Sequence, residues 1–130
     1  MAGLILGTSG CYFNKAEISN RNLLEGKRAV FIYAHDDPMA FKEGVKKGLI
    51  GLGFSITDVK SEADLAVDYS GVCGWDVFHY TCSSIRLFVT DRASGEVLVK
   101  ARFGGGVPFS VETILDILFK EIEAEIKQGS

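Results

Sequence analysis

The segment SIRLFVTDRASGEVLVKARF, Ser84–Phe103, decides the fold predicted for this chain. Apolar and polar residues alternate over 84–90 and again over 97–103, which is the period-two pattern of half-buried strands. The residues between them, 91–96, have turn chemistry, and Gly95 can adopt the positive φ that tight turns often require. The sequence therefore predicts a β-hairpin here.

A helix is predicted to follow the hairpin. The run Gly104-Gly105-Gly106-Val107-Pro108 is expected to break the last strand and to act as a flexible joint, since no basic residue follows that could meet a phosphate. Ser110 is then expected to cap a helix over 111–127. Its apolar stripe consists of Ile114, Leu115, Leu118, Ile122 and Ile126. Its solvated face carries two i,i+4 ion pairs: Asp116–Lys120 and Glu123–Lys127.

Three strands and a helix are expected upstream of the hairpin. Residues 54–59 and 63–70 are predicted to form short strands, and the apolar run 29–34 is typical of a strand inside a sheet. Asp37 is a good N-cap for a helix over 39–52, which Pro38 can begin. The apolar face of that helix consists of Phe41, Val45, Leu49 and Leu52.

Glycines mark the same helix. Three of them are spaced along it and predict a face that lies close to the sheet: Gly44, Gly48 and Gly51. Gly53 is expected to end the helix, and Glu43–Lys47 is expected to form an i,i+4 pair.

The order of elements predicts an α+β fold, with a mainly antiparallel sheet of four to five strands and two helices packed on one face. The predicted single domain covers 28–130. Residues 12–27 are expected to be a lead-in segment along the surface, and 1–11 to be the remnant of a lipoprotein signal.

Composition excludes several classes of protein. The chain has 130 residues, with 14 Lys and Arg against 17 Asp and Glu, a formal charge of −3, and 47% hydrophobic residues. These values are typical of one ordinary globular domain rather than of a disordered chain. With a pI near 5.4, a broad basic surface for nucleic acid is not expected.

The N-terminal residues 1–11, MAGLILGTSGC, carry no charged side chain. A membrane-spanning helix needs about 20 apolar residues, so this segment is too short to cross a bilayer. Its ending, Thr8-Ser9-Gly10-Cys11, resembles the bacterial lipobox, in which small residues precede a cysteine that carries lipid. Thr8 departs from the usual Leu. The alternative is an N-terminus with an incidental cysteine.

Three further features carry a family resemblance. The sequence resembles uncharacterised lipoproteins of Gram-negative bacterial envelopes in three places. These are Gly53-Phe54 at the end of a helix, the strand Ala63-Asp64-Leu65-Ala66-Val67, and a hairpin whose turn runs from Asp91 to Gly95. The similarity covers about residues 28–127. It implies an α+β fold and an envelope location, and it implies no catalytic residue.

The cysteines are odd in number, three in all. With Cys11 lipidated, Cys73 and Cys82 are left as a disulfide pair that would close a loop of about ten residues and contribute roughly 2.7 kcal/mol. Such a bridge persists in the periplasm and is rare in the cytosol. The alternative is two independent, partly buried thiols.

Aromatic residues gather between these two cysteines. Trp75, Phe78, His79 and Tyr80 are candidate partner-binding residues if the segment is a loop, because rigid amphipathic rings are enriched at binding hot spots. If the segment instead continues the strands, Trp75 and Phe78 belong to the core.

The leading functional hypothesis is a non-catalytic lipoprotein on the periplasmic face of an envelope membrane, anchored through Cys11. It would bind an envelope protein or glycan, with no nucleic acid, cofactor or metal. The alternative is a small hydrolase or metal-dependent enzyme that uses His35, Asp36 and His79. His35-Asp36-Asp37 has a simpler interpretation as the end of a strand followed by a helix cap.

Overall fold

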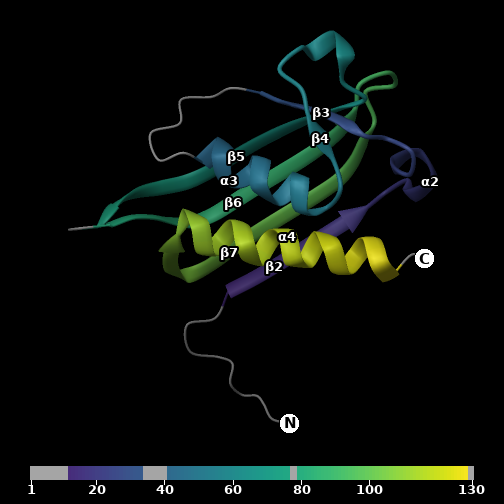
Figure 1. Cartoon of the computed structure of the whole chain (residues 1–130). Helices are drawn as coiled ribbons and strands as arrows, with labels where there is room; N and C mark the ends of the chain where they lie inside the picture. The colour runs from purple at the N-terminus through teal and green to yellow at the C-terminus, as the bar shows by residue number, and fades with distance from the viewer. Residues whose placement is uncertain (1–11, 34–40, 77–78, 129–130) are drawn as a thin grey trace.

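A computed structural model describes residues 12–33, 41–76 and 79–128 of the chain (Figure 1). Its strands form one six-stranded sheet in the order β2-β7-β6-β5-β3-β4. The strands are β2 Tyr12–Ile18, β3 Ala29–Ile32, β4 Ser55–Ile56, β5 Leu65–Asp76, β6 His79–Asp91 and β7 Val97–Ser110. The helices are α2 Arg21–Leu24, α3 Phe41–Gly51 and α4 Val111–Gln128, with a short 3-10 helix, η1, at Lys60–Glu62.

The predicted hairpin is present as β6 and β7, which pair antiparallel. Ile85, Leu87 and Val89 are buried, whereas Arg86 between them is exposed, so the alternation of β6 is confirmed. In β7 the alternation holds from Val99 to Phe103, but Leu98 is buried as well, where the register between the two strands shifts. Gly95 adopts a φ of 78° in the turn, and its N–H donates to the carbonyl of Asp91 at 2.8 Å. The hairpin therefore forms as its own sequence specifies.

The α+β class is confirmed, but the sheet is mixed and larger than expected. β3 runs parallel to both β5 and β4, while β2, β7, β6 and β5 pair antiparallel with their neighbours. α3 lies between β3 and β4 in the chain, and such a crossover is what two parallel neighbours require. Both strands and the helix between them were predicted, although β4 covers only two residues of the expected 54–59. Their parallel pairing was missed, because strand direction is set by contacts between segments and not by a local pattern.

Residues 12–27, expected to lead in along the surface, contribute β2 and α2 instead. β2 pairs antiparallel with β7, and Ala16 is buried while Lys15 and Glu17 are exposed. The same face carries the polar Asn14 and the partly buried Ile18, so the apolar signal of this strand is weak, which explains the wrong prediction. The sheet therefore includes residues that precede the predicted start of the domain at 28.

The glycine run was predicted to break the last strand, and this prediction is wrong. β7 continues to Ser110, and its register on β6 shifts so that Cys82 pairs with Phe109 while Ser84 pairs with Gly104. β2 supplies the missing partner, because Phe13 pairs with Gly104. Bulged glycines can thus stay within a sheet when a second strand lies beside them.

α4 matches its prediction closely. The Thr113 N–H donates to Ser110 Oγ at 3.2 Å, so Ser110 caps the helix. Both expected ion pairs are present, Asp116–Lys120 at 3.2 Å and Glu123–Lys127 at 3.6 Å. Ile126 of the predicted stripe is partly buried against the core. The other four residues of the stripe are buried: Ile114, Leu115, Leu118 and Ile122.

α3 and α4 cover one face of the sheet and lie against each other (Figure 1). Gly44 and Gly48 of α3 face α4 rather than the sheet, and a Cβ on Gly51 would meet nothing within 4 Å, which corrects their predicted role. A Cβ on Gly44 would lie 2.5 Å from Leu115 Cδ1, and one on Gly48 would overlap the Phe119 ring. Glu43 pairs with Lys46, at 3.6 Å, and not with Lys47 as expected.

Within the described ranges, no helix is long and apolar enough to cross a membrane.

Candidate functional site

The predicted aromatic and cysteine residues lie on the β5–β6 hairpin, whose far end extends past the helices (Figure 1). In the backbone register Cys73 is opposite Cys82, Trp75 is opposite Tyr80, and Asp76 is opposite His79. Phe78 lies outside the described residues. The segment therefore continues two paired strands, and the choice between binding surface and core for these rings stays open.

The register also bears on the predicted disulfide. Directly opposed residues of an antiparallel pair have Cα atoms about 4.5–5.5 Å apart, which lies within the range of about 4.4–6.8 Å found across disulfides. We expect protein exported to an oxidising compartment to show, after denaturation without reductant, no free thiol at Cys73 or Cys82. Thiol labelling with mass mapping measures this, and two labelled cysteines at these positions would contradict the bridge.

The other predicted site residues, Cys11, His35 and Asp36, lie outside the described residues. The last described residue before His35 is Tyr33, whose N–H donates to the carbonyl of Val67 at 3.0 Å. On β5 that level is about 30 Å from Asp76, the partner of His79, at the rise of a strand. The described residues therefore do not bring the end of β3 close to His79. The enzymatic alternative stays a prediction. No group of three metal-ligating side chains occurs among the described residues.

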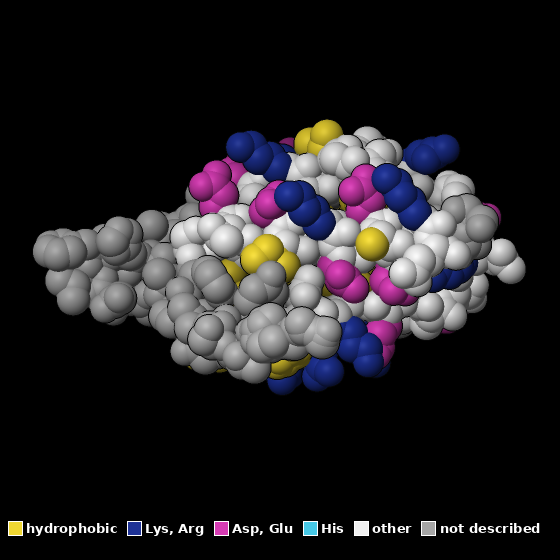
Figure 2. Space-filling model, turned by 90° about the horizontal axis from the view of Figure 1, so that it is seen from below, with side chains coloured by type: hydrophobic (Ala, Val, Ile, Leu, Met, Phe, Trp, Pro, Cys, Tyr) yellow, Lys and Arg dark blue, Asp and Glu magenta, His cyan; other side chains and the backbone are white. Residues whose placement is uncertain are grey.

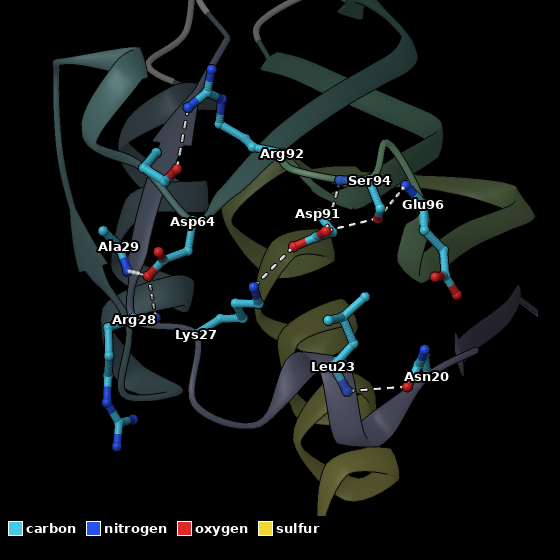
Figure 3. Close-up of polar contacts among 11 residues, drawn as sticks. Asn20, Leu23, Lys27, Arg28, Ala29, Asp64, Asp91, Arg92, Ser94 and Glu96 are labelled. Carbon is cyan, nitrogen blue, oxygen red and sulfur yellow. Dashed lines mark hydrogen bonds and ion pairs between the residues drawn. The ribbon is translucent and has the colours of Figure 1, made fainter.

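A polar cluster lies at the opposite end of the sheet (Figure 3). Asp91, 2% exposed, accepts hydrogen bonds from the Ser94 Oγ–H at 2.7 Å and the Ser94 N–H at 2.9 Å, both at Oδ2. Lys27 Nζ lies 3.2 Å from Asp91 Oδ1. The hydrogen bonds from Ser94, aided by Lys27, hold the pKa of the Asp91 carboxyl below its usual value.

Asp64 has a similar role beside it. Its Oδ2 accepts from the backbone N–H groups of Arg28, at 3.0 Å, and Ala29, at 3.1 Å, which lower the pKa of the Asp64 carboxyl. Its carbonyl accepts from the Arg92 N–H at 3.0 Å. The Ser94 contacts close the β6–β7 turn on itself, whereas the Lys27–Asp91 pair and the contacts of Asp64 join separate segments of the chain. The cluster is therefore best explained as a structural joint between the start of β3 and the β6–β7 turn.

Seen from below the view of Figure 1, the surface shows basic and acidic side chains interspersed (Figure 2). A hollow of about 560 Å³ lies between α3 and α4, and its rim carries both signs of charge, Lys47 with Glu43, Glu112 and Asp116. No single chemistry of ligand follows from that mixture.

The face of the sheet that points away from α3 and α4 is different. Lys15 on β2 is the register partner of Arg102 on β7, which is in turn the partner of Arg86 on β6. These three exposed residues therefore form a row of cations across three adjacent strands, which we call the cation row. Cross-strand neighbours of this kind lie about 5 Å apart at Cβ.

A second row runs beside the first. It consists of Glu17, Lys100, Phe88 and Asp68, again in register across the strands. Residues of both rows line a hollow of about 280 Å³, the open-face hollow: Lys15, Glu17, Phe88, Lys100 and Arg102. It joins three cations to one carboxylate and one aromatic side chain.

The charges of the cation row are poorly compensated. Lys15 Nζ lies 3.2 Å from Glu17, a surface pair in which both side chains are more than half exposed. Among the described residues, no carboxylate lies within 4.0 Å of Arg86, Lys100 or Arg102. The guanidinium of Arg102 instead lies over the ring of Phe13, 5.6 Å from its centroid. Like charges opposite one another cost stability, so this row is unfavourable for folding alone.

Sequence reasoning missed this surface. The alternation of β6 and β7 did indicate that Arg86, Lys100 and Arg102 point to one face. The alternation did not indicate that residues 12–18 form β2, the strand that brings Lys15 and Phe13 to this face. It also did not indicate the register that sets the cations side by side.

The architecture defines a class: an α+β domain with a mixed six-stranded sheet, of which the described helices α3 and α4 cover one face and leave the other open. No protein-family model matches the sequence, and no curated protein matches it.

Solved structures with the same fold do match. A DUF4136 family protein from Bacteroides thetaiotaomicron has 8% identity and a TM-score of 0.59, over 91% of this chain and 95% of that one. PelC from Paraburkholderia phytofirmans, solved as a dodecamer, has 12% identity and a TM-score of 0.55, over 88% and 96%. At these identities the likeness is one of fold alone.

Proposed function

We propose that this protein is a non-catalytic binding protein of the bacterial cell envelope, tethered by a lipid on Cys11, which presents the open face of its sheet to another envelope component. The observation that carries the binding role is the open-face hollow beside the cation row, because like charges placed opposite one another at the surface weaken the fold and suit a ligand of opposite charge. The envelope location is supported by the resemblance of Thr8-Ser9-Gly10-Cys11 to a lipobox and of residues 28–127 to envelope lipoproteins.

The joint at Asp91 and Asp64 supports a scaffold role rather than a catalytic one. Its carboxylates accept hydrogen bonds from backbone and serine donors, and burial keeps Asp91 from solvent. A carboxylate engaged in this way stays ionised and bound to its own chain, which suits a rigid platform.

Radiolabelled palmitate tests the anchor. We expect the full gene product, expressed in a Gram-negative host, to incorporate label and to fractionate with membranes. Cys11→Ser is expected to abolish both, while Cys82→Ser, the matched control, keeps the label. Wild-type protein that takes up no palmitate, or Cys11→Ser protein that still does, would refute the lipid anchor.

A further inference from the structure

The geometry of the open face points to a specific class of partner, and this inference rests on the proposed function: we propose that the open-face hollow binds an acidic polysaccharide, with Lys100 and Arg102 meeting its carboxylates. Both residues are exposed, line the hollow, and lie on β7 two positions apart, so their side chains share one face of the sheet.

Charge complementarity requires a negative ligand. The cation row places Lys15, Arg102 and Arg86 across three strands, and Lys100 extends the positive surface into the second row. Arginine presents paired donors that match a carboxylate in two parallel hydrogen bonds. A ligand that lies across the strands would meet a cation about every 5 Å on this row.

The acidic residues on the same face favour a polysaccharide over a nucleic acid. Glu17 lines the hollow, and Asp68 is exposed in the same register row. They would repel closely spaced phosphates, but they can accept hydrogen bonds from hydroxyl groups. Phe88 supplies an apolar surface between Lys100 and Asp68. Carboxylates, hydroxyls and apolar ring faces occur together in a polymer of acidic sugars.

Two other occupants fit less well. An extended acidic peptide usually binds at a sheet edge, where it gains backbone hydrogen bonds, and the face of a sheet offers none. A second copy of this chain stacked on the same face would oppose two surfaces in which cations outnumber carboxylates.

Binding of labelled polygalacturonic acid to the purified full chain tests the proposal. We expect saturable binding that weakens with added salt, and no binding of neutral dextran. The double variant Lys100→Gln/Arg102→Gln is expected to bind at least about tenfold more weakly. The control Lys120→Gln/Lys127→Gln removes the same charge from exposed positions on α4 and is expected to bind as the wild type does.

Several results would overturn the proposal: no binding of polygalacturonic acid, equally tight binding of single-stranded DNA, or equal losses in the two double variants. Thermal melts of both double variants establish that each is folded. If polygalacturonic acid does not bind while palmitate-labelled wild-type protein still cross-links to envelope material, the proposed class of partner is wrong and the proposed function stands. If the protein takes up no palmitate and cross-links to nothing in the envelope, the proposed function fails as well.

Discussion

Gly48→Leu is expected to destabilise the protein by about 3 kcal/mol, because α3 and α4 approach each other too closely for a side chain at this position. A Cβ there would overlap the ring of Phe119, which is nearly buried and held by α4. The ring cannot move aside cheaply, since the overlapped atoms include its root at Cγ as well as its edge. Relief of this overlap must therefore separate the helices or shift them on the sheet.

Gly51→Leu is the matched control. Gly51 belongs to the same helix, but a Cβ at this position would meet nothing within 4 Å. The change should leave stability the same or raise it slightly, because leucine has a higher helix propensity than glycine. Urea unfolding followed by circular dichroism measures both variants. Equal midpoints for the two would show that the contact of Gly48 with Phe119 does not limit the packing of α3 on α4.

Asp91→Ala is expected to lower the melting temperature at neutral pH by about 5–10 °C. The change removes the acceptor for both Ser94 donors and leaves Lys27 without its carboxylate. The exposed pair Asp116–Lys120 provides a control, and Asp116→Ala should change the melting temperature little. Differential scanning calorimetry measures all three proteins.

The same variant should change the response to acid. Asp91 and Asp64 both have a pKa below the usual value in the folded state, so the unfolded chain binds protons more readily than the folded one. Their stabilising contribution is complete above about pH 4, the value of an unperturbed Asp, and is lost as the pH falls through the lower folded-state values. Wild-type stability should therefore decline below about pH 4, and Asp91→Ala should decline less steeply. An identical slope in both proteins would contradict the role assigned to Asp91.

Some elements were predictable because their signals are local. In β6, β7 and α4 each residue's environment follows from its near neighbours, as alternation or as a helical stripe, and Ser110 and Gly95 mark the boundaries. β2 and the far end of β7 were missed for the opposite reason. Phe13 and Gly104 are register partners, and the ring of Phe13 lies over Gly104. The sequence around either residue does not predict this pairing.

The candidate site divides in the same way. Alternation places Arg86 and Arg102 on the polar side of their strands, which sequence reasoning recognised. That Lys15 joins them in one row depends on a pairing between segments far apart in the chain. The strand register places Cys73 opposite Cys82, and the spacing of these residues along the chain could not have predicted this.

The sequence by itself determined the α+β class, the central hairpin and the closing helix, because hydrophobic periodicity and capping act within a few residues. Only the tertiary structure decided the parallel placement of β3, the seating of α4 against Gly44 and Gly48, and the cation row on the open face. These depend on which strand lies beside which and in what register. Strand order and register are determined by packing between segments far apart in the chain, which a local sequence pattern does not predict.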